Sequence, residues 1–111
     1  MYDFVFSKIM DSDIDSNYSY IKDKLEAPKA AENLYSELYE KINSILENPY
    51  KRPLVQDKYL ASLGIRYIKI KNYILFYIIT KENNTVNILR FMHSIRDWIN
   101  ILKEEDINEI M

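Results

Sequence analysis

The sequence contains no cysteine, a single glycine and a single histidine among its 111 residues. Without cysteine the chain can form no disulfide, no thiolate metal site and no cysteine nucleophile. It also lacks a long apolar run, because the longest, residues 73–79, is far shorter than the ~20 residues that span a membrane. The N-terminal residues do not show the basic and then apolar pattern of a signal peptide. These absences predict a protein of the cytoplasm.

An excess of charge of one sign is also missing. The 15 basic and 17 acidic residues give a net charge of −2, which excludes a uniformly basic nucleic-acid coat protein and an acidic disordered chain. The charges are unevenly spread: residues 1–48 hold 5 basic and 10 acidic groups, residues 49–102 hold 9 and 3, and residues 103–111 hold 1 and 4. An anionic partner is therefore expected to meet the second half. At 13.4 kDa and 48% apolar residues, one domain over residues 1–111 is expected.

The first half of the chain predicts a short strand followed by two helices. Residues 2–7 show a weak alternation that suits a strand with one face on a core. Residues 11–13 supply N-cap candidates for an amphipathic helix over residues 14–25. A second amphipathic helix is expected from Pro28 to Asn48. The short connection between the two predicts an antiparallel helical hairpin.

The second half predicts a β-meander. Residues 49–63 show no sustained period and are interpreted as a mostly irregular segment that Gly64 closes. Three runs rich in β-branched and aromatic residues follow at 65–70, 73–80 and 85–92. Short separators that contain asparagine divide these runs, and asparagine tolerates the positive φ of tight turns. We therefore expect three antiparallel strands.

The middle run, at residues 73–80, is apolar on both faces and is expected to be the central strand. The helical hairpin would cover one face, and a short helix over residues 96–102 the other. Residues 103–111 are interpreted as an acidic tail that forms a frayed helix. The expected fold class is α+β in the order β-α-α-β-β-β, with an antiparallel sheet packed against a helical hairpin and a short C-terminal helix.

Six local patterns span nearly the whole chain. They are Asp13-Ile14-Asp15 with Tyr20-Ile21, Ala30-Ala31, Ile45-Leu46 with Pro49, Gly64 with Arg66, Asn72-Tyr73 with Phe76-Tyr77, and a block from Val86 to Trp98 that contains Arg90, His93 and Arg96-Asp97. In this order they resemble the RelE/ParE superfamily, also called the plasmid stabilisation family, of toxins from bacterial type II toxin–antitoxin systems. The resemblance implies a small growth-inhibiting toxin held inactive by a cognate antitoxin. Members either poison DNA gyrase or cleave mRNA on the ribosome.

A metal-free ribonuclease needs groups that transfer protons and cations that stabilise the phosphorane. Histidine ordinarily changes charge near neutral pH, so His93 is the natural proton-transfer group. The resemblance places Arg66 and Arg90 at positions of phosphate-binding arginines, and their planar guanidinium groups suit phosphate oxygens. Each also extends an apolar strand face, Arg66 in phase with Ile68 and Arg90 with Ile88. All three side chains are expected around one shallow hollow.

Four further residues are candidates for binding. Trp98 could stack on a base, and Lys51 with Arg52 forms the only adjacent basic pair. Arg96 is the fourth, although with Asp97 it could equally form a local ion pair at a helix start.

Structural roles stay open as alternatives. A lone histidine at a strand end is more often structural than catalytic. Lys69 and Lys71 are interpreted as solvated hairpin residues. Asp11, Asp13 and Asp15 are interpreted as helix-capping residues rather than a metal site, because the glycine and glutamate of a calcium-binding loop are missing.

The functional hypothesis is therefore a toxin, narrowly preferred as ParE-like poisoning of DNA gyrase. Ribosome-acting members tend to be strongly basic, unlike this chain, and the ending from His93 to Asp97 resembles the ParE-like branch. The first alternative is a ribosome-dependent, metal-independent mRNA endonuclease that uses His93, Arg66 and Arg90. The second is a non-toxic antitoxin-binding module. No cofactor or metal is expected, and the expected partners are an antitoxin and either gyrase or the ribosome with mRNA.

Overall fold

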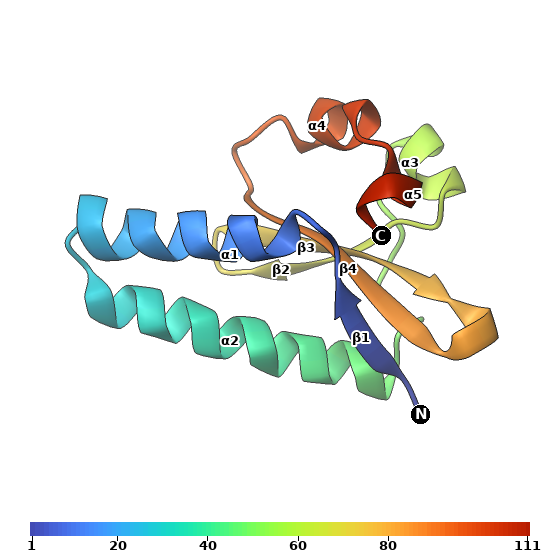
Figure 1. Cartoon of the computed structure of the whole chain (residues 1–111), viewed down its shortest axis with the longest axis horizontal. Helices are drawn as coiled ribbons and strands as arrows, with labels where there is room; N and C mark the ends of the chain where they lie inside the picture. Colours follow the sequence, from blue (N-terminus) through green and yellow to red (C-terminus); the bar gives the residue numbers. More distant parts are fainter.

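The computed structural model describes all 111 residues and has the expected α+β architecture. The elements in chain order are β1 (Asp3–Phe6), α1 (Met10–Ser19), a π-helical segment (Tyr20–Lys24), α2 (Pro28–Glu47), α3 (Lys58–Ser62), β2 (Arg66–Ile70), β3 (Tyr73–Thr80), a 3₁₀ turn (Lys81–Asn83), β4 (Thr85–His93), α4 (Trp98–Glu104) and α5 (Ile107–Ile110). Helices α1 and α2 form the predicted antiparallel hairpin on one face of the sheet (Figure 1). The short helices α3, α4 and α5 lie together at the other face (Figure 1).

The sheet has four strands in the order β1-β4-β3-β2. The predicted meander is confirmed, because β3 pairs antiparallel with both β2 and β4. The first strand joins the sheet by pairing parallel with β4, so that β4 is as central as β3. The turn of the helical hairpin and the β3–β4 turn lie at opposite ends of the molecule (Figure 1).

Two hydrophobic cores explain why β3 is apolar on both faces. Leu75 and Tyr77 point toward the helical hairpin, where they join buried residues of α2 such as Leu38. Ile74 and Phe76 point to the other face, into a core completed by the short helices. Fully burying one such side chain contributes about 1.5–3 kcal/mol, so each face of β3 stabilises a separate layer.

The first helix begins earlier than the sequence predicts. Its N-cap is Ile9, which makes no side-chain capping bond, so the prediction that residues 11–13 cap the helix is wrong. The hydroxyl of Ser7 instead accepts hydrogen bonds from the N–H groups of Ile9 and Met10, at 3.3 and 3.2 Å. Because β1 ends at Phe6, the chain turns directly into the helix through this serine.

The segment 49–63 is more ordered than expected. It contains α3, capped by Asp57, and Leu54 forms an isolated bridge with Arg66 at the edge of β2. The helix escaped prediction because five residues are too few to show a period. Gly64 closes the segment as predicted, with a φ of 88° that side chains other than glycine rarely adopt.

The C-terminal residues are packed rather than frayed. Ile107 and Ile110 of α5 are buried in the second core. The carbonyl of Ile110 accepts a 2.7 Å hydrogen bond from the N–H of Lys8, which ties the end of the chain to the loop after β1. Because the two isoleucines are three residues apart, they form one apolar face of α5, which covers the side of the sheet opposite the helical hairpin. None of the helices combines the length and apolar character needed to cross a membrane.

Candidate functional site

A hollow of about 510 Å³ opens where the end of β4 meets the helical hairpin. Its walls come from the end of α1 and the π-helical segment, the start of α2, the β2–β3 turn and the loop after β4. His93, Arg96 and Lys71 contribute its ionisable groups, and Tyr20 and Tyr73 contribute aromatic rings. The hollow therefore combines an apolar lining with positive charge.

His93 is held in a defined orientation at the end of β4. Its Nδ1 accepts a hydrogen bond from the N–H of Ile95 at 3.2 Å. Its ring meets Tyr73 edge-on with centroids 5.1 Å apart, and Tyr73 in turn stacks on Phe91 at 5.1 Å. Burial raises the pKa of Tyr73, so this phenol stays neutral at physiological pH. Only Nε2 of the imidazole is left free to meet a ligand.

The cations beside His93 belong to turns rather than strands. Arg96 lies exposed in the loop after β4, and Lys71 in the β2–β3 turn is half exposed, as a solvated hairpin residue should be. The Nζ of Lys71 lies 3.9 Å from the carboxylate of Glu37 on α2. Such exposed ion pairs contribute little to stability, about 0–1 kcal/mol, so Lys71 can exchange this partner for another anion.

A β-bulge in β4 reverses the orientation that the sequence predicts for Arg90. Arg90 pairs with Phe76 and Ile88 with Tyr77, which leaves Leu89 as an extra residue. Because side chains alternate along a strand, one inserted residue moves all later side chains to the opposite face. The prediction that Arg90 shares a face with Ile88 is therefore wrong.

Arg90 is consequently buried, with only 7% of its surface exposed. Its guanidinium group donates to both carboxylate oxygens of Asp13, at 2.6 and 2.9 Å, and to Glu105. Asp13 also accepts from the N–H of Phe91 at 3.0 Å. Burial alone would lower the pKa of Arg90, but the hydrogen bonds and charges of Asp13 and Glu105 outweigh it and raise this pKa. Two internal carboxylates thus satisfy the cation.

Arg66 shares the phase of Ile68, as predicted, and lies opposite Tyr77. Its guanidinium group is directed at backbone carbonyls, donating to Arg52 at 2.6 Å and to Tyr50 at 3.4 Å. It also lies over the ring of Tyr50, 5.3 Å from the centroid. A smaller depression of about 310 Å³ beside it is separate from the His93 hollow.

The three expected site residues therefore lie in three places. Arg66 pairs with Tyr77 and His93 with Tyr73, so they are four residues apart along β3, about 13 Å, and on opposite sides of that strand. Arg90 lies on the other face of the sheet. The expectation that these three side chains surround one hollow is wrong, because the bulge and the strand order separate them.

Three of the four predicted binding residues lie at two other locations. Lys51 is exposed and Arg52 half-buried in the loop after α2, beside Arg66 and away from the hollow. Trp98 begins α4 and packs on Phe76 with ring centroids 5.2 Å apart, on the second core. Of the four predicted binding residues, only Arg96 lines the His93 hollow.

The roles of three residues in this region were not predicted from the sequence: Asp13, Asn17 and Glu105. Asp13 accepts a hydrogen bond from the N–H of Phe91. Asn17, one helical turn later, donates from its amide to the carbonyl of the same residue at 2.9 Å. The pair closes the edge of β4 where β1 has ended. The four-residue spacing of two polar groups on the sheet-facing side of α1 was the available signal. Glu105 gave no such signal, because its partner Arg90 lies 15 positions away, in β4.

The groups that line the hollow limit the chemistry that it can perform. It contains a single imidazole, that of His93, whereas cleavage by the 2′-hydroxyl needs both a proton acceptor and a proton donor. Its cations and aromatic rings can contact a partner that carries both negative charge and apolar surface. No three His, Cys, Asp or Glu side chains are arranged to hold a metal ion.

Residues 4–98 match the family model described as the ParE toxin of type II toxin–antitoxin system, parDE. Among solved structures, the chain is similar to the chromosomal ParDE system from P. aeruginosa, with a TM-score of 0.67, 14% identity, and coverage of 84% of this chain and 96% of that one. It is also similar to the RelBE2 toxin–antitoxin complex from Mycobacterium tuberculosis, with a TM-score of 0.57, 20% identity, and coverage of 83% and 96%.

The isolated E. coli RelE toxin is a third structural relative, with a TM-score of 0.54, 16% identity, and coverage of 93% of this chain and 97% of that one. At such identities these likenesses show a shared fold. No curated protein sequence matches the chain significantly.

Proposed function

The chain belongs to the ParE toxin family of type II toxin–antitoxin systems, and from this premise we propose that it stops bacterial growth by binding and poisoning DNA gyrase. It acts as a binding protein in the cytoplasm, where gyrase works, and it cleaves no RNA itself. A cognate antitoxin binds and neutralises it until the toxin is released from this complex. The structural relatives from ParDE and RelBE toxin–antitoxin systems support such a partner.

The proposal rests on the separation of His93, Arg66 and Arg90, the groups that a ribonuclease would use on a phosphate. A ribonuclease of this size would need its arginines and its proton-transfer group around one phosphate. Here Asp13 and Glu105 neutralise Arg90, Arg66 faces backbone carbonyls, and His93 lies elsewhere. Inhibition through binding does not need these groups to converge.

The loop after β4 is the surface that we assign to target binding. Ile95 is 85% exposed beside the exposed Arg96, at the rim of the hollow. An exposed apolar side chain next to arginine is typical of protein interfaces, in which arginine is enriched and buried apolar groups supply affinity. DNA gyrase or its complex with DNA would supply the complementary negative charge.

Inducible expression in a bacterial host tests the proposal. We expect gyrase-dependent DNA breaks, intact messages and arrested growth. Arg96→Gln should lower toxicity at least tenfold in a plating assay, because it removes the exposed cation and leaves the fold unchanged. Lys58→Gln is the matched control, since it removes an exposed cation from α3, outside the hollow. This control should remain as toxic as the native chain.

Three other outcomes would contradict the proposal. Message cleavage that is lost in His93→Ala would select the ribosome-dependent endonuclease. Normal growth with neither breaks nor cleavage would select the non-toxic antitoxin-binding module. Equal loss of toxicity in Arg96→Gln and Lys58→Gln would show that the loop after β4 is not the binding surface.

A further inference from the structure

A second depression, of about 550 Å³, lies between the two helices of the hairpin, away from the His93 hollow. Its lining residues are Ile14, Asp15 and Tyr18 from α1 and Glu32, Tyr35 and Ser36 from α2. On each helix these residues are spaced by one, three or four positions, so each set forms one continuous face. We call this depression the hairpin groove.

Two tyrosine rings form the aromatic part of the hairpin groove. Tyr18 and Tyr35 meet edge to face, with centroids 6.2 Å apart and planes at 81°. Tyr35 is 43% exposed, although tyrosine has ample apolar surface to bury. Ile14 closes the floor. Because the face of an aromatic ring carries negative electrostatic potential, exposed rings in this arrangement attract a cation.

Two carboxylates of the groove lack any basic partner within the chain. Asp15 and Glu32 are both exposed, and neither takes part in any of the ion pairs of the protein. Tyr39 lies near the groove on α2. Its pKa is raised to about 12, first by burial, then by the hydrogen bond with Tyr35 and the charge of Asp11.

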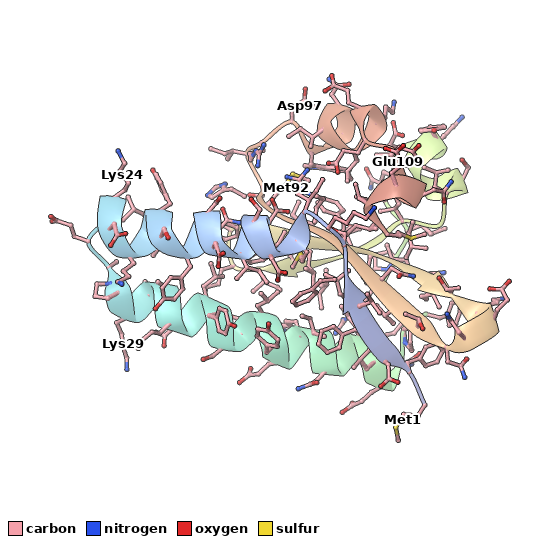
Figure 2. All side chains as sticks on the ribbon, in the orientation of Figure 1. Met1, Lys24, Lys29, Met92, Asp97 and Glu109 are labelled. Carbon is pink, nitrogen blue, oxygen red and sulfur yellow. The ribbon has the colours of Figure 1, made fainter.

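Lysines at the end of the hairpin do not compensate this charge. Lys24 and Lys29 lie at the turn between the helices and point away from the body of the protein (Figure 2). Residues 1–48 as a whole carry 10 acidic and only 5 basic groups. The negative charge of the hairpin groove therefore remains available to a ligand.

We propose that the hairpin groove binds a cationic side chain of a partner protein, with arginine preferred over lysine. The guanidinium plane can stack on Tyr35 while its N–H groups donate to Asp15 and Glu32. An anionic or neutral side chain would gain neither interaction. None of the residues that line the hairpin groove also lines the His93 hollow, so this site is independent of the target proposed above.

Nuclear magnetic resonance of the tyrosine rings tests this site in the full-length protein. N-acetyl-arginine amide is the probe, and N-acetyl-citrulline amide is its uncharged control of the same shape. We expect the arginine probe to shift the ring resonances of Tyr18 and Tyr35 saturably, with a millimolar dissociation constant, and the citrulline probe to shift neither. Resonances are assigned with Tyr18→Phe and Tyr35→Phe. N-acetyl-lysine amide should bind more weakly than the arginine probe.

Charge variants then identify the groups that bind the probe. Glu32→Gln should raise the dissociation constant at least threefold, because it removes one carboxylate from an exposed position without disturbing the fold. Glu47→Gln, at the end of the same helix and outside the groove, is the matched control and should leave the constant unchanged.

Four results would overturn the proposal. They are the absence of saturation up to about 50 mM probe, an equal response to the citrulline probe, and an unchanged dissociation constant in Glu32→Gln. The fourth is tighter binding of free arginine than of the capped probe, which would indicate a small-molecule site instead of a docking point for a protein side chain.

Discussion

Arg90 shows how strongly a single side chain depends on its strand register. The guanidinium group is buried and contacts carboxylates from α1 and from the segment between α4 and α5. One oxygen of Glu105, Oε2, is buried without a hydrogen-bond partner, so Arg90 is the group that compensates the charge of this carboxylate. The triad joins three parts of the chain that are distant in sequence.

We expect Arg90→Leu to destabilise the protein by about 3–5 kcal/mol. The substitution leaves Asp13 and Glu105 as buried carboxylates without a cation, which costs more than the lost ion pair itself. Urea unfolding at neutral pH measures the free energy. Arg96→Leu is the control, and because its side chain is exposed it should change stability by no more than about 0.5 kcal/mol. A loss below about 1 kcal/mol in Arg90→Leu would contradict the role of the triad.

At the scale of elements, α3 shows how a five-residue helix is kept in place. Asp57 is its N-cap and accepts from the N–H of Leu60 at 3.0 Å. The same carboxylate lies 3.0 Å from Nζ of Lys103 on α4. The backbone hydrogen bond from Leu60, followed by the contact with Lys103, holds the pKa of Asp57 below its ordinary value of 3.8. The cap thus ties α3 to α4.

This pKa predicts an acid-dependent contribution to stability. A carboxylate with a depressed folded-state pKa stabilises the fold above its unfolded value, 3.8, and this contribution is lost as the pH falls through the folded value. Asp57→Asn keeps a capping oxygen but has no charge to lose. Urea unfolding from pH 7 downward should show the stability difference between native protein and variant shrinking below about pH 3.8.

Lys103→Met supplies the second arm of this test, because it removes the cation and keeps the cap. Its difference from the native protein should shrink over the same pH range. Curves for Asp57→Asn and the native protein that stay parallel down to about pH 2 would refute the prediction.

Turn residues were predicted with mixed success. Asn84, after the 3₁₀ turn, has the positive φ expected of asparagine, 51°. In the β2–β3 turn, however, Lys71 rather than Asn72 adopts the positive φ, 55°. The boundaries of β2, β3, β4 and α2 followed the sequence closely, because periodicity extends over many residues, whereas a two-residue turn is set by the twist of the strands that it joins.

For the whole molecule, the C-terminal segment completes the second core. Ile107 and Ile110 join Leu102 and Phe76 there, and Glu105 binds Arg90. The second face of the sheet would be open without this segment, because α3 and α4 alone are short.

Removal of residues 105–111 should therefore destabilise the protein by at least about 3 kcal/mol, from two buried isoleucines at about 1.5–3 kcal/mol each and the lost carboxylate. Thermal and urea unfolding measure the effect. Removal of Met111 alone, an exposed residue, is the control and should have little effect. A truncated protein as stable as the full chain would show that the segment does not contribute to the core.

The sequence by itself determined the first strand, the helical hairpin and the meander, their order and the family, because helical and strand periods and local motifs are written in neighbouring residues. It also fixed the phase of Arg66, which lies in an unbroken strand. Only the tertiary structure decided where Arg90 points, which carboxylates neutralise it, and which cations accompany His93. These depend on one bulge and on contacts between residues such as Asp13 and Arg90, 77 positions apart. No local pattern records such a contact, since packing of distant segments creates it.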